Sequence, residues 1–320
     1  MIEPRSKDIV LPSPLRRGDG VALVSPAYRA PMESVEATAE VLRGWGFEPV
    51  VGAHAARLEA GRYAGTEQER LADLRSAFGD PQIKAILCNR GGYGTLRLLD
   101  SLRGEDFSAA PKWLVGYSDI TTLLAMETCA GVAGIHGPMC THIGPAGGGD
   151  RSSLLLRDLL LGEVPFYELP AHPQNRPGKA FGTLVGGNLC TFVPLLGTWA
   201  DPTLEGPFVL FVEEVEESMH HIDRLFCMLR LRGVLERCAG VVLGDFTDCG
   251  AEFDYGSVEA MLLRFLEPYG IPVLCGFPAG HGTENLPLVM GAPVTVEVRG
   301  DGASLCFDIP LRQRTVCVSD

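Results

Sequence analysis

The first part of the chain alternates between short apolar runs and longer amphipathic segments. Residues 21–24 and 83–88 are apolar runs of strand length, and residues 35–45 repeat apolar side chains at helical spacing up to Gly46. Alternation of this kind predicts a parallel sheet with helices on both faces. We therefore expect an α/β fold in which residues 1–150 form the N-terminal domain.

Breaks in this pattern predict a second domain. The 320 residues exceed what one hydrophobic core usually serves. A glycine-rich break covers residues 144–150, and a proline-rich stretch covers residues 170–178. We interpret residues 151–178, with a short helix at 154–161, as a linker. Residues 179–320 are then a C-terminal α/β domain richer in strands.

A serine lies where one predicted strand turns into a helix. Residues 112–116 form the end of an apolar strand, Ser118 follows, and a helical pattern begins at Ile120. A serine on such a turn projects from the sheet, and the N–H groups of the next helix point toward it. The match to the nucleophile motif G-x-S-x-G is partial, because Ile120 occupies the place of its last glycine. Ser118 is therefore either a nucleophile or a helix N-cap.

An acid and a histidine follow two later apolar strands. Glu213 comes after residues 207–212, and His281 lies in a glycine-rich loop after residues 271–275. Open α/β sheets build their sites beyond the carboxyl ends of strands. A serine nucleophile needs a base and an orienting carboxylate, and the order serine, acid, histidine supports such a triad. The serine would come from the first domain and its partners from the second, so we expect the active site at the domain interface.

Two other segments contain groups that bind ligands in other proteins. The loop at residues 89–94 is followed by a predicted helix from about Gly94, but Arg97 replaces the third glycine of a dinucleotide fingerprint. Its glycines can instead bring backbone N–H groups close to an oxyanion. The acidic segment contains Glu217-x-x-His220, which has the spacing of a carboxylate–histidine metal motif. Such a metal site needs a second copy of the motif on another helix, and the sequence contains none. We interpret it as a solvated turn and expect no metal site and no cofactor.

Eight motifs that run in order along the chain carry a family resemblance: residues 24–27, 89–94, 115–119, 136–139, 182–189, 210–214, 221–224 and 276–282. It resembles the LD-carboxypeptidases, serine peptidases that include muramoyltetrapeptide carboxypeptidases and microcin C immunity peptidases. The resemblance implies a triad of Ser118, Glu213 and His281, with the N–H groups of Gly92 and Asp119 as the oxyanion hole. The family often has Glu-Asp where this chain has Glu213-Glu214, so two carboxylates compete for the acid role, and the end of the apolar strand favours Glu213.

The resemblance also implies a substrate and an assembly. It implies hydrolysis of an L-to-D amide bond in a muramoyl tetrapeptide during peptidoglycan recycling, by a homodimer. The alternatives are a microcin-type peptidase that cleaves aminoacyl or peptidyl sulfamoyl adenylates, and an inactive peptide-binding homologue. A carboxypeptidase must recognise a terminal carboxylate, which arginine does with a bidentate fork. Arg90, beside the glycine loop, and Arg224 are the candidates for that role.

Composition argues against several classes of partner and cellular location. A net charge of −13 disfavours nucleic acid and anionic membranes as partners. No apolar run reaches the roughly 20 residues of a membrane span, and residues 1–7 lack the apolar core of a signal peptide. The ten cysteines contain no C-x-x-C pair and are typical of reduced, mostly core-filling thiols. We expect a cytoplasmic enzyme with a small peptide substrate.

Overall fold

The computed structural model describes residues 9–59, 62–250 and 256–318 and divides into two compact units. The N-terminal unit contains residues 9–163 and also residues 286–291. The C-terminal unit contains the described residues of 164–285 and 292–320. Residues 1–7, where the sequence predicts no signal peptide, lie outside the described residues. The stretch interpreted as a linker, residues 151–178, contains a helix and a strand.

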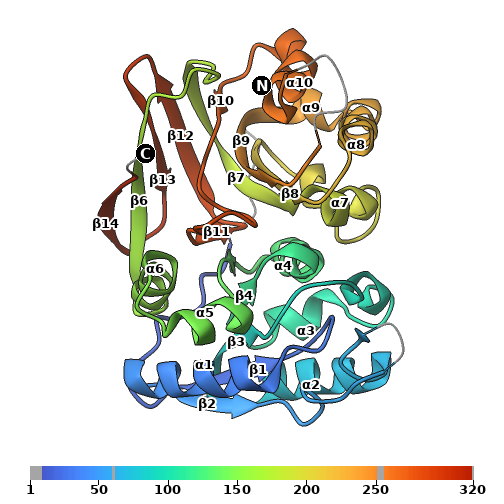
Figure 1. Cartoon of the computed structure of the whole chain (residues 1–320), viewed down its shortest axis with the longest axis vertical. Helices are drawn as coiled ribbons and strands as arrows, with labels where there is room; N and C mark the ends of the chain where they lie inside the picture. Colours follow the sequence, from blue (N-terminus) through green and yellow to red (C-terminus); the bar gives the residue numbers. More distant parts are fainter. Residues whose placement is uncertain (1–8, 60–61, 251–255, 319–320) are drawn as a thin grey trace. The chain divides into compact units, whose positions relative to one another are not determined.

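The N-terminal unit is built on a six-stranded sheet in the order β11-β5-β4-β3-β1-β2 (Figure 1). Neighbouring strands are parallel except β11, which is antiparallel to β5. The α/β class expected from the sequence is confirmed. The strands are β1 (Gly20–Val24), β2 (Glu48–Val51), β3 (Ile83–Cys88), β4 (Trp113–Gly116), β5 (Gly134–His136) and β11 (Leu288–Met290).

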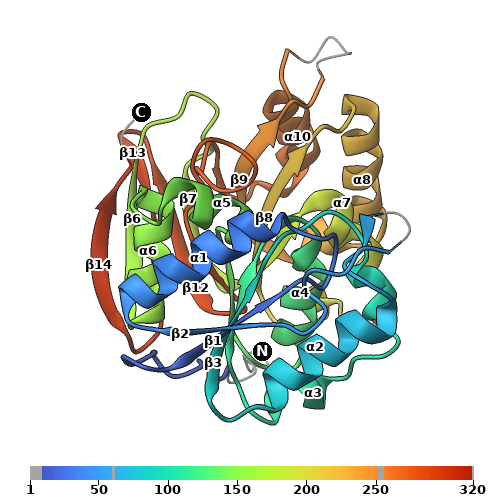
Figure 2. The same ribbon diagram turned by 60° about the horizontal axis from the view of Figure 1, so that its bottom comes forward.

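Helices flank this sheet. Helix α1 packs against α5, whereas α2 and α4 both pack against α3 (Figure 2). Helix α1 ends at Gly46, which has a φ of 95° and closes the helix as expected. The helix expected from about Gly94 is a 3-10 helix (Thr95–Leu98), and the short α-helix α3 follows it. The helices are α1 (Met32–Trp45), α2 (Glu67–Gly79), α3 (Gly104–Ser108), α4 (Thr121–Cys129), α5 (Cys140–Ala146) and α6 (Arg151–Leu160).

The C-terminal unit has an eight-stranded sheet in the order β10-β9-β8-β7-β12-β13-β6-β14. Strands β10, β9, β8 and β7 are mutually parallel, and β12, β13 and β6 continue in antiparallel pairs. Its strands are β6 (Glu163–Pro170), β7 (Gly178–Asn188), β8 (Phe208–Val215), β9 (Cys238–Thr247), β10 (Val273–Leu274), β12 (Pro293–Arg299), β13 (Gly302–Phe307) and β14 (Arg312–Cys317). Its helices are α7 (Leu189–Phe192), α8 (Met219–Leu231), α9 (Val234–Arg237) and α10 (Val258–Leu266).

Strand β8 is the buried centre of the parallel part. Phe208, Leu210 and Val212 join one hydrophobic cluster with the apolar residues of α8 and α10. Because successive side chains of a strand point to opposite faces, Val209 and Phe211 face the other side of the sheet. The strand runs past the expected end at residue 212 and includes Glu213 and Glu214. Their side chains therefore leave the backbone on opposite faces.

Two further features concern the whole described chain. All ten cysteines are free thiols. Among the helices of the described residues, none combines the length and the apolar character that crossing a bilayer requires.

We predict that Gly186→Ala destabilises the C-terminal unit sharply. Gly186 has a φ of 121°, and an added Cβ would clash with the Phe211 carbonyl oxygen in the neighbouring strand. Left-handed strain of about 1–2 kcal/mol and overpacking of about 1–3 kcal/mol should together lower the unfolding free energy by about 3 kcal/mol. Urea denaturation measures it.

Gly300→Ala is the matched control, since Gly300 has open space around its Cβ position and no positive φ. Equal midpoints for the two variants would contradict the described register of β7 and β8.

Candidate functional site

Ser118 occupies a strained turn between β4 and α4. Tyr117 is extended, with a φ of −150°, and Ser118 has a φ of 62° at the start of a 3-10 turn that leads into α4. A non-glycine residue in the left-handed region is uncommon, and such strain clusters at functional sites. A Cβ on Gly116 would lie 2.8 Å from Ile120 Cγ2, so the turn is tightly closed. Ser118 thus stands at a sharp strand-to-helix junction, as the sequence predicted.

The glycine loop at residues 89–94 packs directly against Ser118. A Cβ on Gly91 would lie 2.9 Å from Ser118 Cβ and 3.0 Å from its Oγ, and 3.4 Å from the Asp119 nitrogen. Gly92, with a φ of 115°, packs on the Tyr28 side chain. Only a residue without a side chain allows the loop this close to the serine. Gly91 was not singled out from the sequence, although it stands next to Gly92 in the same motif.

The side chain of Asp119 fastens this loop to the serine turn. The Thr95 N–H donates to Asp119 Oδ2 at 2.9 Å, and the Thr95 hydroxyl donates to the Asp119 carbonyl oxygen at 2.6 Å. Burial raises the pKa of the Asp119 carboxyl, although these hydrogen bonds favour the charged form. The carboxylate therefore holds the loop in place, and the Asp119 nitrogen lies close to Gly91.

Glu213 and His281 are paired in the C-terminal unit. His281 Nδ1 lies 2.7 Å from Glu213 Oε2, the Glu213 side chain is 0% exposed, and that of His281 is 18% exposed. A Cβ on Gly280, where φ is 134°, would lie 2.9 Å from the same carboxylate oxygen. The glycine-rich loop therefore gives the histidine room to reach the buried acid. Asn285 stabilises that loop, since its Oδ1 accepts the Gly280 N–H at 3.1 Å.

The electrostatic surroundings favour a charged imidazole. Burial opposes the charged form of His281, but the hydrogen bond and charge of Glu213, together with Glu214 and Asp245, raise its pKa. Burial and the charge of Glu213 raise the pKa of Asp245 itself to about 6, against the hydrogen bond from the Gly282 N–H. Sequence reasoning missed Asp245. It follows the apolar run of β9 much as Glu213 follows the run of β8, and that signal could have found it.

Glu214 serves the opposite face of β8. It accepts hydrogen bonds from Asn188 Nδ2 at 2.7 Å, from the Cys190 N–H at 2.8 Å and from the Val215 N–H at 3.0 Å. Its carboxylate ties the end of β7 and the start of α7 to β8. Of the two adjacent acids, Glu213 is the one hydrogen-bonded to His281 in the structure.

The remaining predicted residues are Arg90, Arg224 and those of the acidic turn. Arg90 is half-buried next to the glycine loop, and Arg224 is exposed on α8. In the acidic turn, Glu217 contacts His221 rather than the exposed His220, with 2.5 Å between Oε2 and Nδ1. This pair is partly buried and lies close to Cys190. The turn expected to be solvated is thus only partly exposed at Glu217 and His221.

The predicted residues fall into two groups. In the N-terminal unit, the Ser118 turn and the glycine loop with Arg90, Gly92 and Asp119 form one arrangement. In the C-terminal unit, Glu213 and His281 form another, with Arg224 on a helix that begins after the same strand. The first group offers a strained hydroxyl beside backbone N–H groups, and the second offers a carboxylate-oriented imidazole. These are the components of acyl-transfer chemistry.

Comparison with known proteins covers both units. The family model of the LD-carboxypeptidase N-terminal domain matches residues 21–137, and that of the C-terminal domain matches residues 181–296. A murein tetrapeptide carboxypeptidase of Pseudomonas aeruginosa is 34% identical over 293 residues, which cover 87% of this chain and 92% of the relative. The microcin C7 self-immunity protein of Escherichia coli is 28% identical over 336 residues, covering 92% and 95%.

A solved structure has the same fold. The muramoyltetrapeptide carboxypeptidase from Oxalobacter formigenes superimposes with a TM-score of 0.80 at 27% sequence identity. The match covers 89% of this chain and 97% of that structure.

Proposed function

Since the chain belongs to the LD-carboxypeptidase family, we propose that it is a serine carboxypeptidase that hydrolyses an L-to-D amide bond of a muramoyl tetrapeptide. The observation that carries this proposal is the hydrogen bond between buried Glu213 and His281. A buried carboxylate needs a compensating partner, and an imidazole held in this way is suited to general base catalysis. The names of the carboxypeptidase relatives support the substrate class.

Ser118 is the proposed nucleophile. Its Oγ attacks the carbonyl carbon while His281 takes the hydroxyl proton, and the acyl-enzyme forms as the C-terminal D-amino acid leaves with that proton. Water then attacks the acyl carbon while His281 takes a proton from it, and that proton returns to Ser118 Oγ as the shortened peptide leaves. Because Nδ1 faces Glu213, the nitrogen that moves the proton is Nε2. No metal or cofactor takes part in these steps.

The proposed oxyanion hole is formed by the N–H groups of Gly92 and Asp119. The close packing of Gly91 on Ser118 supports it, because this packing keeps the loop backbone beside the nucleophile. Donors fixed in advance stabilise the charge that develops on the carbonyl oxygen. For the substrate's terminal carboxylate we propose Arg90 or Arg224.

The proposal extends to the setting of the enzyme. Ten free thiols fit a reducing compartment, and we propose a cytoplasmic enzyme that meets its peptide during peptidoglycan recycling. A homodimer is proposed from the family resemblance alone.

One alternative substrate has a specific observation in its favour. The similarity to the microcin C7 self-immunity protein supports a peptidase that cleaves an aminoacyl or peptidyl sulfamoyl adenylate. An inactive peptide-binding homologue is the third candidate, and the Glu213–His281 pair argues against it. A muramoyl tetrapeptide and an aminoacyl sulfamoyl adenylate, assayed side by side, separate the three.

We predict that the wild-type enzyme releases the terminal D-amino acid from the tetrapeptide and that Ser118→Ala abolishes this release. Loss of a triad nucleophile costs many orders of magnitude in rate. Mass spectrometry of the products measures turnover, and circular dichroism checks the fold. If folded Ser118→Ala keeps more than about a hundredth of wild-type turnover, the nucleophile is wrongly assigned. Turnover of the adenylate alone would favour the microcin-type function.

We predict that Glu213→Gln lowers kcat by about 10³-fold or more, by analogy with loss of a triad acid. Glu214→Gln should lower kcat far less, because its carboxylate holds Asn188 and Cys190 rather than the histidine. Steady-state kinetics on one tetrapeptide compares the matched variants. The reverse ranking would transfer the acid role to Glu214, and two mild losses would refute the triad.

A further inference from the structure

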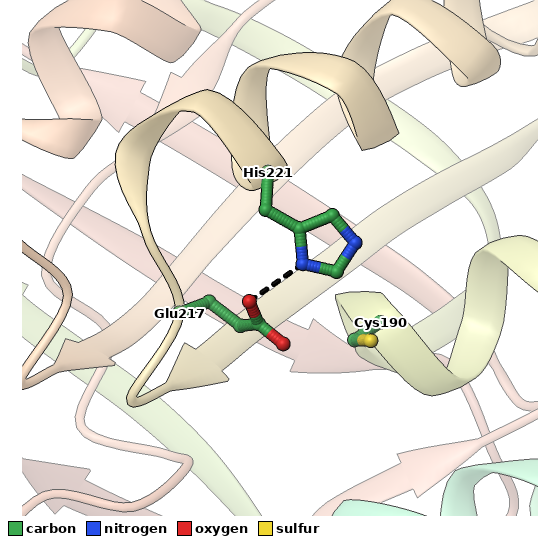
Figure 3. Close-up of side chains that lie close together, drawn as sticks. All are labelled: Cys190, Glu217 and His221. Carbon is green, nitrogen blue, oxygen red and sulfur yellow. Dashed lines mark hydrogen bonds and ion pairs between the residues drawn. The ribbon is translucent and has the colours of Figure 1, made fainter.

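Three side chains with metal-binding groups lie together at the edge of the C-terminal sheet where β7 and β8 end. Cys190 is in α7, Glu217 is in the turn after β8, and His221 is in the first turn of α8. Figure 3 shows that the three side chains lie close together. One ligand atom from each lies within 4.8 Å of the others. The proposed catalytic steps use none of them.

The three groups match the ligands of one class of ion. Zinc binds cysteine sulfur at about 2.3 Å, and histidine nitrogen and carboxylate oxygen at about 2.0–2.2 Å, in tetrahedral geometry. Ligand atoms around such an ion are about 3.3–3.8 Å apart, so small side-chain rotations bring this set into place. Calcium and magnesium prefer oxygen ligands, and a thiolate therefore selects against them.

The backbone around the three residues is already fixed. The Cys190 N–H donates to Glu214 at 2.8 Å, and Asn188 caps α7 by accepting the Thr191 N–H at 3.1 Å. On the other side, the Glu216 N–H donates to the Thr247 carbonyl oxygen at 2.9 Å, which anchors the turn to β9. Supporting hydrogen bonds of this kind position ligands for a metal and lower the cost of ordering them.

Charge and access also favour a cation. The carboxylates of Glu214 and Glu217 both lie beside Cys190, and a divalent ion would offset the repulsion between the two acids. The three ligand residues are each partly exposed, which leaves an entry path and room for water as a fourth ligand.

We propose that Cys190, Glu217 and His221 form a binding site for a divalent transition-metal ion, with zinc as the best match. The ion joins α7 to the turn that leads from β8 into α8. It has no part in the proposed hydrolysis, so the site stands or falls separately from the proposed function.

The experiment uses the full-length protein after EDTA treatment and dialysis. Zinc is titrated by calorimetry, and cobalt is added as a spectroscopic probe whose charge-transfer band reports a thiolate ligand. We expect one zinc per chain, a cobalt–thiolate band and a raised Tm with zinc. Cys190→Ser and His221→Gln should each weaken zinc binding by at least about 100-fold.

Two matched variants control for nonspecific binding. Cys227→Ser removes another partly buried thiol on α8, and His220→Gln removes the exposed neighbouring imidazole. Both should bind zinc as the wild type does. Glu217→Gln keeps the side-chain shape and serves as a third ligand variant if either of the others fails to fold.

Two results would overturn the site. The first is no stoichiometric zinc binding by the wild-type protein. The second is undiminished zinc binding in folded Cys190→Ser, His221→Gln and Glu217→Gln, which would locate the ion elsewhere. The zinc-free protein should still turn over the tetrapeptide. Loss of turnover on EDTA treatment, restored by zinc, would instead contradict the metal-free mechanism, so the two proposals fail in distinguishable ways.

Discussion

The buried hydrogen bond between Glu213 and His281 is the interaction around which the C-terminal unit is arranged. A carboxylate with no exposed surface is costly unless a partner compensates its charge, and here the partner is an imidazole 2.7 Å away. Gly280 lets the loop approach the acid, and Asn285 holds that loop. The same bond orients the histidine and raises its pKa against the effect of burial. Stability and proposed chemistry thus depend on one contact.

Because successive side chains of β8 point to opposite faces, the two adjacent acids have different partners. Glu213 leaves β8 on the face of the histidine loop, and Glu214 leaves it on the face of α7. A shift of β8 by one residue would exchange the two faces. The parallel register, in which Asn188 pairs with Glu213, and the tight approach of Gly186 to Phe211 prevent that shift. Sheet register therefore determines which carboxylate can meet the base.

Local patterns predicted much of this arrangement, and long-range contacts account for the rest. The 83–88 strand, the stop of α1 at Gly46 and the turn at Ser118 follow from apolar runs and glycine. Residues 286–291 return to the first sheet and form β11 there. No local sequence pattern predicts this strand, because it exists through its pairing with β5. Strand β8 extends beyond the apolar residues 207–212, because β7 and β9 continue to pair with it. The Cys190–Glu217–His221 cluster joins two segments about 30 residues apart, which spacing alone does not reveal.

The coupling between Glu213 and His281 is measured by the pKa of His281, followed by NMR titration of its ring in the wild type and in Glu213→Gln. In the wild type the pKa should lie above the ordinary value of about 6.5, because Glu213 stabilises the imidazolium. In the variant the charge is gone while burial remains, so the pKa should fall below that value. An unchanged pKa would show that Glu213 does not act on the histidine, and it would contradict the central claim.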